Sequence, residues 1–326
     1  MVLKPTNLFV PYNPDLALLP KKHNNPMPKA ANTIHWLKIT PVLFLVLWSG
    51  GYATAKVGLQ YSGPMTLLVI RFGLVVLIAL LALLIFKPSL PRTPAEWINL
   101  AIVGFLMQAV YFGFSYVAFS SGVGAGTLAL LMSFQPILVG ITAPKWAGET
   151  VGWRQWTGLL LGLLGAGIVI LTRSSIEPPT VIGFVAATLA LSGITIASLW
   201  EKRFGLSHHP VVTNAVGYIA GLIGVLPFAV MFEAPEGSLN FLSGVQWTWQ
   251  FGAAIAYLVI GNSVIAVGLL LAMIRAGEVS RVSALFFLVP PVAACIAWVL
   301  IDEIIPLSAW PGIFIAATGV YLATRK

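Results

Sequence analysis

The second half of this chain repeats the first half, and this duplication constrains the possible folds more than any other feature of the sequence. One set of matching residues is spaced by 155 positions and comprises Gly122 and Gly277, Ala129 and Ala284, and Pro136 and Pro291. A second set is spaced by 154 positions and comprises Glu149 and Glu303, Trp156 and Trp310, Gly158 and Gly312, and Gly165 and Gly319. We therefore expect two copies of one structural unit.

The composition places both copies in a membrane. The chain is 58% hydrophobic and 9% charged, whereas a soluble domain carries roughly 25% charged residues. Its apolar runs are about 20 residues long and do not alternate with polar residues, which is typical of membrane-spanning helices. Because backbone polar groups in hydrocarbon must be paired within their own segment, the sequence predicts an all-α, polytopic membrane protein.

Ten transmembrane helices are predicted, five in each copy. In the first repeat, residues 37–172, they are expected at 37–59, 64–86, 96–119, 125–143 and 152–172. In the second repeat, residues 181–324, they are expected at 181–203, 211–232, 247–275, 279–300 and 308–324. An odd number of spans per copy inserts the second copy into the bilayer in the opposite direction. Inverted repeats are typical of secondary transporters, whose halves move around a central site.

Basic residues predict the topology of these spans. Fifteen lysines and arginines lie in the tail through Lys38, in the loops after the second, fourth, sixth and eighth spans, and in the C-terminal tail. The loops on the opposite side carry Arg173 alone. Positive residues stay on the cytoplasmic side, so both termini are expected there. The net charge of +8 is thus a topology signal, and no nucleic-acid partner is expected.

Residues 1–36 contain six prolines, which predicts a disordered cytoplasmic tail starting at Met1 or Met27.

Acidic residues are absent from the predicted depth of every span. All ten lie in tails, loops or helix ends. A buried acid is the usual partner of a cationic substrate or a proton relay, so a dedicated cation exporter is disfavoured. The pair His208-His209 lacks further ligands at a metal-binding spacing, and no nucleotide or catalytic motif is present. We therefore expect no metal, no cofactor and no enzymatic activity.

Two basic residues lie inside predicted spans. Lys56 is about 29 Å along the first helix, near the outer interface, where it either extends to lipid headgroups or lines the outer mouth of a cavity. Arg71 is about 10 Å below the outer end of the second helix, where it either hydrogen-bonds helix-end carbonyls or contacts a ligand. If both face inward, a carboxylate-bearing or neutral solute is favoured over a cation.

Polar and aromatic residues recur at helical spacing along several spans. Each one alone is explained by an interhelical hydrogen bond, worth about 0.6 kcal/mol. Together they predict a semi-polar central cavity, because ligand sites combine apolar walls with a few polar groups. The candidate substrate-binding residues are Ser49, Tyr52, Lys56, Arg71, Gln108, Tyr111, Tyr218, Asn262 and Phe286.

Prolines and glycines mark two further features. Pro136 and the pair Pro290-Pro291 interrupt the fourth and ninth spans at equivalent depths of the two repeats. They are either gating hinges or static kinks. Glycines such as Gly158 and Gly319 permit close helix contact, so the fifth and tenth spans are expected to form a peripheral scaffold.

Several motifs resemble the drug/metabolite transporter superfamily, specifically its EamA-type ten-helix exporters. They are WSGGYATAK at Trp48–Lys56, Ile70-Arg71-Phe72, Glu149 with the glycines of Gly158–Gly165, and Leu288–Pro291. The resemblance covers residues 37–324 and implies two EamA repeats, a bacterial inner membrane location and a pathway lined by spans 1–4 and 6–9. Members of this superfamily export amino acids and other small metabolites, in some cases aromatic amino acids. The proline-rich tail departs from the family pattern.

These observations predict a secondary transporter that exports a small zwitterionic or neutral metabolite, foremost an amino acid, by alternating access. The expected partners are the small-molecule substrate and the lipid bilayer, with the protein a monomer or homodimer. One alternative is an exporter of neutral hydrophobic drugs. A membrane-embedded enzyme acting on lipid is disfavoured because clustered catalytic histidines or acids are missing, and a non-transporting sensor is the other alternative.

Overall fold

The computed structural model describes residues 33–173, 180–205, 208–301 and 305–325. The chain divides into two compact units, Met1–Lys38 and Ile39–Lys326, and the account below concerns the second. Of the expected disordered tail, residues 1–32 with both candidate start methionines lie outside the described residues, as does Glu303. The first helix begins at Thr33, slightly before the predicted start of the first span.

Every regular element in the described ranges is helical, which confirms the predicted fold class. The first repeat contains α1 (Thr33–Gly58), α2 (Pro64–Phe86), α3 (Pro94–Gly104), η2 (Phe105–Phe112), α4 (Gly113–Ser120), α5 (Ala125–Met132), α6 (Gln135–Trp146) and α7 (Trp153–Arg173). The third span is one long helix made of α3, η2 and α4, in which η2 has the wider π-helical turn. The fourth span is broken between α5 and α6.

The second repeat has the same order of helices. It contains α8 (Val181–Phe204), α9 (Pro210–Phe232), η3 (Phe241–Gly244), α10 (Trp249–Ala256), η4 (Tyr257–Val267), α11 (Gly268–Ala276), α12 (Val279–Ala284), η5 (Leu285–Leu288), α13 (Val289–Ile301), η6 (Leu307–Ala309) and α14 (Trp310–Thr324). Its third span again carries a π-helical segment, η4. Its fourth span is again broken, here by the tighter 3-10 turn of η5. The two repeats therefore share a π-helical segment in the third span and a break in the fourth span.

Nine helices in the described part of the chain are long and apolar enough to cross a membrane, and they correspond to the second through tenth predicted spans. The first predicted span, α1, has 26 residues, which is long enough to cross. Pro41, the polar segment Trp48–Tyr52 and Lys56 lie within it. Of these residues, Trp48, Gly51 and Tyr52 reappear below at the cavity.

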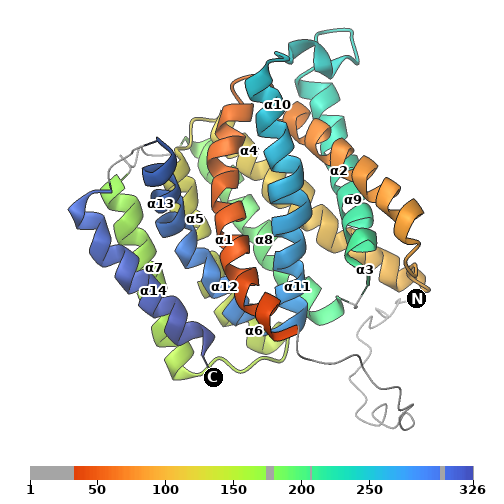
Figure 1. Cartoon of the computed structure of the whole chain (residues 1–326). Coiled ribbons are helices and arrows are strands. Elements are labelled where there is room, and N and C mark those ends of the chain that lie inside the picture. The colour runs from red at the N-terminus through yellow and green to blue at the C-terminus, as the bar shows by residue number, and fades with distance from the viewer. Residues whose placement is uncertain (1–32, 174–179, 206–207, 302–304, 326) are drawn as a thin grey trace, which may run out of the picture. The chain divides into compact units, whose positions relative to one another are not determined.

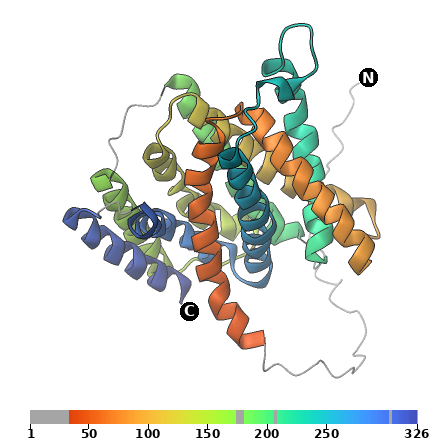
Figure 2. The same ribbon diagram turned by 45° about the horizontal axis from the view of Figure 1, so that its top comes forward.

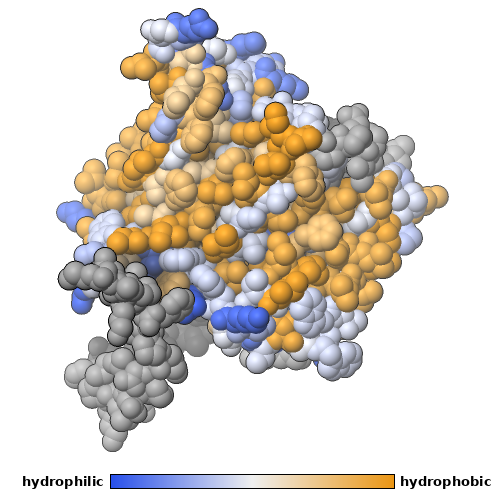
Figure 3. Space-filling model, turned by 180° about the vertical axis from the view of Figure 1, so that it is seen from behind, coloured by the Kyte–Doolittle hydropathy of each residue, from blue (hydrophilic) through white to orange (hydrophobic). Residues whose placement is uncertain are grey.

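The surface of the bundle suits lipid. Hydrophobic residues cover the middle of the face in Figure 3, and its strongly hydrophilic residues lie toward the edges. Side chains such as Leu84, Ile85 and Leu160 are more than half exposed in the protein, which would be unusual for a monomer in water. Within this unit, α1 begins at the end of the bundle at which α14 ends (Figure 1). This agrees with an even number of crossings.

Equivalent helices of the two repeats pack against each other. The helix α2 runs along α9, and α7 runs along α14, the latter pair at one side of the bundle (Figures 1 and 2). At the α7–α14 contact, a Cβ atom on Gly158 would lie 2.4 Å from the Ala323 nitrogen, and one on Gly319 would lie 2.3 Å from the Gly162 nitrogen. Only glycine lets the two backbones approach this closely, so these positions form the predicted scaffold.

Carboxylates close helix ends at both ends of the bundle. Glu149 accepts hydrogen bonds from the backbone nitrogens of Val279 (2.5 Å) and Ser280 (3.1 Å) at the start of α12, and from Ser280 Oγ (2.6 Å). Glu233 accepts from the nitrogens of Met65 and Thr66 at the start of α2, both at 2.7 Å. A carboxylate at a helix N-terminus satisfies unpaired N–H groups and the positive end of the helix dipole. Glu149 and Glu233 therefore stabilise helix N-termini and do not lie in the middle of a membrane span.

Candidate functional site

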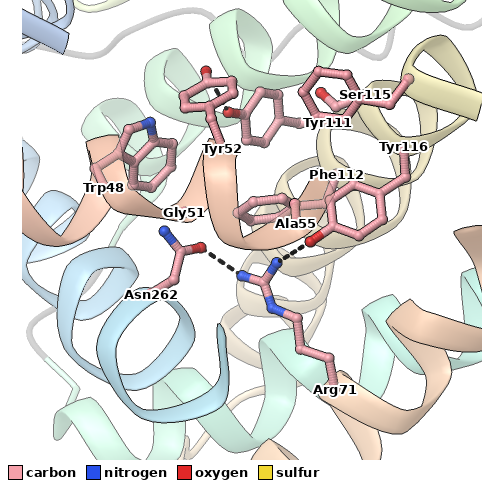
Figure 4. A pocket seen from close by; sticks show the side chains of 11 residues that line it. Trp48, Gly51, Tyr52, Ala55, Arg71, Tyr111, Phe112, Ser115, Tyr116 and Asn262 are labelled. Carbon is pink, nitrogen blue, oxygen red and sulfur yellow. Dashed lines mark hydrogen bonds between the residues drawn. The ribbon is translucent and has the colours of Figure 1, made fainter. Parts of the chain in front are cut away.

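A small cavity of about 20 Å³ lies between α1, α2, the third span of the first repeat and η4 of the second repeat (Figure 4). Its walls are Trp48, Gly51, Tyr52, Ala55, Arg71, Tyr111, Phe112, Ser115, Tyr116, Phe119 and Asn262. The cavity therefore lies where the two repeats meet. This is the place at which inverted-repeat transporters bind their solutes.

Arg71 supplies the only charged group of this wall. Its side chain is fully buried, with 0% exposure. Nε donates to Ser263 Oγ at 2.7 Å, and Nη2 donates to Asn262 Oδ1 at the same distance. Nη1 donates to the Tyr116 hydroxyl at 3.1 Å. All three acceptors are neutral, so no carboxylate in the described structure balances the guanidinium.

The guanidinium keeps hydrogen-bonding capacity for a ligand. It has five N–H donors, and the three bonds to protein use one on each nitrogen. The three printed bonds leave one N–H on Nη1 and one on Nη2, and the Tyr218 hydroxyl also lies close enough to the guanidinium to interact with it. The Phe112 ring lies 4.3 Å from the guanidinium carbon and covers one face of the group. N–H donors on two nitrogens of one guanidinium can pair with the two oxygens of a carboxylate.

Close approach of α1 to η4 fixes the position of Asn262. A Cβ atom on Gly51 would lie 2.4 Å from Asn262 Nδ2. This nitrogen donates to the Leu47 carbonyl oxygen at 3.4 Å, while the oxygen of the same amide accepts from Arg71. Gly51 thus leaves the space that lets one amide connect α1 to the guanidinium of α2.

Aromatic rings form the rest of the wall. The Tyr52 and Tyr111 hydroxyls are 3.2 Å apart and share a hydrogen bond. Trp48 is stacked on Tyr111 with ring centroids 6.0 Å apart, and Phe119 meets Tyr52 edge-on at 6.4 Å. Ser115 Oγ is buried without a partner in the described structure. The wall therefore offers flat apolar surfaces, one cation and one free hydroxyl.

Four of the predicted binding residues meet in this cavity, namely Tyr52, Arg71, Tyr111 and Asn262. Lys56 is exposed in the last turn of α1, with Nζ 5.7 Å above the ring of Phe119. Since Phe119 lines the cavity, Lys56 lies at its rim. Ser49 is buried away from the cavity and donates to the Val289 carbonyl of α13 at 3.3 Å.

The remaining candidates line neighbouring spaces. Gln108 and Tyr218 border a second, smaller cavity of about 10 Å³, and the Tyr218 hydroxyl donates to the Ser263 carbonyl at 3.1 Å. Gln108 does not share the cavity with Tyr111 because both belong to η2, and the wider π-helical turn removes residues three apart from a common face. Phe286 packs edge-on against Trp48 at 5.4 Å and so supports the cavity wall from behind.

The predicted hinge prolines lie at the broken spans. Pro136 is in the first turn of α6, directly after the break that follows α5. Pro290 and Pro291 are in the first turn of α13, directly after η5. Across the two breaks, Gln135 Nε2 donates to Ser283 Oγ at 3.2 Å. The geometry matches between the repeats, and the hinge role stays a prediction.

Seven cavity residues were not among the candidates. Trp48, Gly51 and Ala55 lie within the family motif at Trp48–Lys56, and the other four are Phe112, Ser115, Tyr116 and Phe119. Tyr116 follows Tyr111 by five residues, a spacing that no α-helical pattern selects. Ser263, which holds Arg71 from outside the wall, is adjacent to the predicted Asn262. No group of three metal-ligating side chains occurs among the described residues.

Comparison with known proteins agrees with this arrangement. The sequence model of the EamA-like transporter family matches residues 36–171 and again residues 179–325. A probable amino-acid metabolite efflux pump of Escherichia coli strain K12 is 26% identical over 288 residues, covering 87% of this chain and 93% of the relative. An uncharacterized inner membrane transporter of the same strain is 24% identical over 286 residues, covering 86% and 87%.

A solved crystal structure shares the fold, with a TM-score of 0.72 at 19% identity, and covers 89% of this chain and 96% of that one. Both of these Escherichia coli relatives are named as transport proteins and not as enzymes. Because the family matches both halves of a chain whose helices cross a membrane many times, this protein is a multi-pass membrane transporter that belongs to the EamA-like transporter family.

Proposed function

We propose that this transporter exports amino acids and similar small metabolites, zwitterionic or neutral overall, by alternating access. The observation that carries the proposal is Arg71, a fully buried cation that lines an aromatic cavity, has neutral hydrogen-bond partners and keeps two N–H donors beyond its three bonds. A substrate carboxylate would accept both donors and balance the charge. The rings of Trp48, Tyr52 and Tyr111 would hold the apolar part of the substrate.

The direction and mechanism of transport are supported by two further features. Relatives in Escherichia coli and Salmonella typhimurium are named as probable amino-acid metabolite efflux pumps. The broken spans α5–α6 and η5–α13 carry prolines at equivalent places of the repeats. Bending at these breaks would open the cavity to one side of the membrane and then to the other.

We further propose that both termini face the cytoplasm of a bacterial inner membrane. The end of the bundle that holds the end of α14 also holds the C-terminal ends of α2, α6, α8 and α11 (Figure 1). These helix ends, the described residues that closely follow them and the C-terminal tail carry Lys87, Arg92, Lys145, Arg154, Lys202, Arg203, Arg275, Arg281 and Arg325. Such a concentration is typical of the cytoplasmic side. The Escherichia coli relative named as an inner membrane transporter supports the location.

Export of neutral hydrophobic compounds is the second candidate function, and the aromatic wall favours it. A neutral compound would use the rings and leave the two N–H donors of Arg71 unpaired. The two functions therefore differ in their dependence on Arg71. A panel of labelled amino acids and hydrophobic dyes, tested on the same purified protein, would separate them.

The proposed function is tested by substrate counterflow in proteoliposomes with the Arg71→Ala and Cys295→Ala variants. Cys295 is an exposed residue of α13, outside the cavity wall. We expect Arg71→Ala to lose most amino-acid counterflow and Cys295→Ala to retain it. Amino-acid counterflow at equal rates in both variants would remove Arg71 from the site and with it the basis of the proposal.

A further inference from the structure

We infer that the cavity prefers monocarboxylate anions to the zwitterionic amino acids of the same carbon skeleton. This inference rests on the proposed function, because it uses Arg71 as the carboxylate-binding group. It extends the substrates to aryl- and alkylcarboxylates and to amino-acid derivatives whose nitrogen is uncharged, such as N-acylated forms.

The site around Arg71 carries positive charge without a balancing acid in the described structure. Arg71 is fully buried, and its three hydrogen-bond acceptors are the neutral groups of Tyr116, Asn262 and Ser263. No acidic side chain and no histidine occurs among the described residues of the cavity wall. At the rim, Lys56 adds a second positive charge above Phe119. A ligand with a net charge of −1 leaves this site closer to neutrality than a ligand with no net charge.

The ammonium group of an amino acid adds a further positive charge to this site. With the carboxylate on Arg71, the ammonium is held only a few ångströms from the guanidinium, and two like charges repel in a poorly solvated site. The polar groups of the described wall that can accept its protons are neutral ones, namely the hydroxyls of Tyr52 and Tyr111, which share one hydrogen bond, and Ser115 Oγ, which has no partner. None of them carries a negative charge that would offset the repulsion from the guanidinium.

The ring faces of the wall are the other possible partners of a cation. The guanidinium of Arg71 already covers the Phe112 ring at 4.3 Å. The Trp48 ring has Tyr111 stacked on it and Phe286 against it edge-on. Two of the wall's ring faces are thus engaged already, and the described wall offers a cation for a carboxylate but no anionic group for an ammonium.

The experiment compares three labelled probes that share a phenylethyl skeleton: 3-phenylpropionate, phenylalanine and phenethylamine. Their half-saturation concentrations for counterflow are measured in proteoliposomes with the full-length protein. The same measurements are made on Arg71→Gln and on the matched control Arg92→Gln, in the loop between α2 and α3. We expect 3-phenylpropionate to half-saturate at a concentration at least tenfold lower than phenylalanine, with no saturable flux of phenethylamine.

The outcomes separate this inference from the proposed function. One outcome is that phenylalanine half-saturates at a concentration equal to or lower than that of 3-phenylpropionate, and that Arg71→Gln loses counterflow of both probes. This outcome would overturn the anion preference and leave amino-acid export intact. Saturable phenethylamine flux would also overturn the preference. Counterflow of all probes unchanged in Arg71→Gln would overturn both. Loss of 3-phenylpropionate flux in Arg71→Gln, with full flux in Arg92→Gln, is the result that supports both.

Discussion

Replacing Gly51 by alanine tests whether one amide of η4 holds the binding arginine in place. The new Cβ atom would lie 2.4 Å from Asn262 Nδ2 and 3.0 Å from Asn262 Cγ. These atoms belong to the end of a side chain, so Asn262 can rotate away without disturbing either backbone. In doing so it would give up the 2.7 Å hydrogen bond from Arg71 Nη2 and the 3.4 Å bond to the Leu47 carbonyl.

The magnitude follows from the bond that is lost. A hydrogen bond to a charged group contributes roughly 1.5–3 kcal/mol. We assume that this hydrogen bond holds the Arg71 guanidinium in the position in which it binds substrate. Loss of the bond would then weaken substrate binding by up to the full free energy of the bond. We therefore expect the half-saturation concentration for counterflow to rise by between about tenfold and 150-fold, since 1.4 kcal/mol corresponds to a factor of ten.

The matched control is Gly73→Ala in α2, where an added Cβ atom meets nothing within 4 Å. This variant should transport as wild type does. The double variant Gly51→Ala/Asn262→Ala should be no worse than Asn262→Ala alone, because both changes remove the same contact. Equal half-saturation in Gly51→Ala and Gly73→Ala, or additive losses in the double variant, would refute the role given to Asn262. Melting temperatures in detergent show whether each variant is folded.

Two further predictions concern the scaffold and the topology. Gly158→Ala should destabilise the protein by roughly 1–3 kcal/mol, because its Cβ would lie 2.4 Å from the backbone nitrogen of Ala323 in α14. Gly167→Ala in the same helix α7 meets nothing within 4 Å and should melt as wild type does; identical melting temperatures for the two variants would contradict the packing argument. In a Cys295→Ala background, a cysteine at position 325 should react with a membrane-impermeant maleimide only in inverted membrane vesicles. Labelling in intact cells with an intact inner membrane would place the C-terminus outside.

The agreement between sequence and structure is best at the level of whole helices. The nine spans counted by hydropathy were all predicted, and the breaks near Pro136 and Pro290 were located by the repeat. The glycines that bring α7 and α14 together were identified from their spacing. Each of these features depends on many residues or on a backbone property of glycine or proline, so a single sequence carries a clear signal for it.

The agreement is weaker for the cavity wall, and the two π-helical segments explain why. In η2, Gln108 and Tyr111 were expected on one face, yet they border different cavities. Tyr116 contacts Arg71 although its spacing from Tyr111 fits no α-helical face. A π-helical turn changes the direction of every side chain on one side of it relative to those on the other. Its position depends on packing between helices and leaves little trace in the local sequence.

The sequence by itself determined that this chain is a duplicated, helical membrane protein, because hydropathy and repetition are summed over whole spans. The sequence also placed the charged residue Arg71 within the second span, below its outer end. Only the tertiary structure decided what that charge meets. Its partners Asn262 and Ser263 lie 191 and 192 residues away in the chain. The close approach of α1 at Gly51 positions Asn262, and no local pattern encodes such a contact between distant helices.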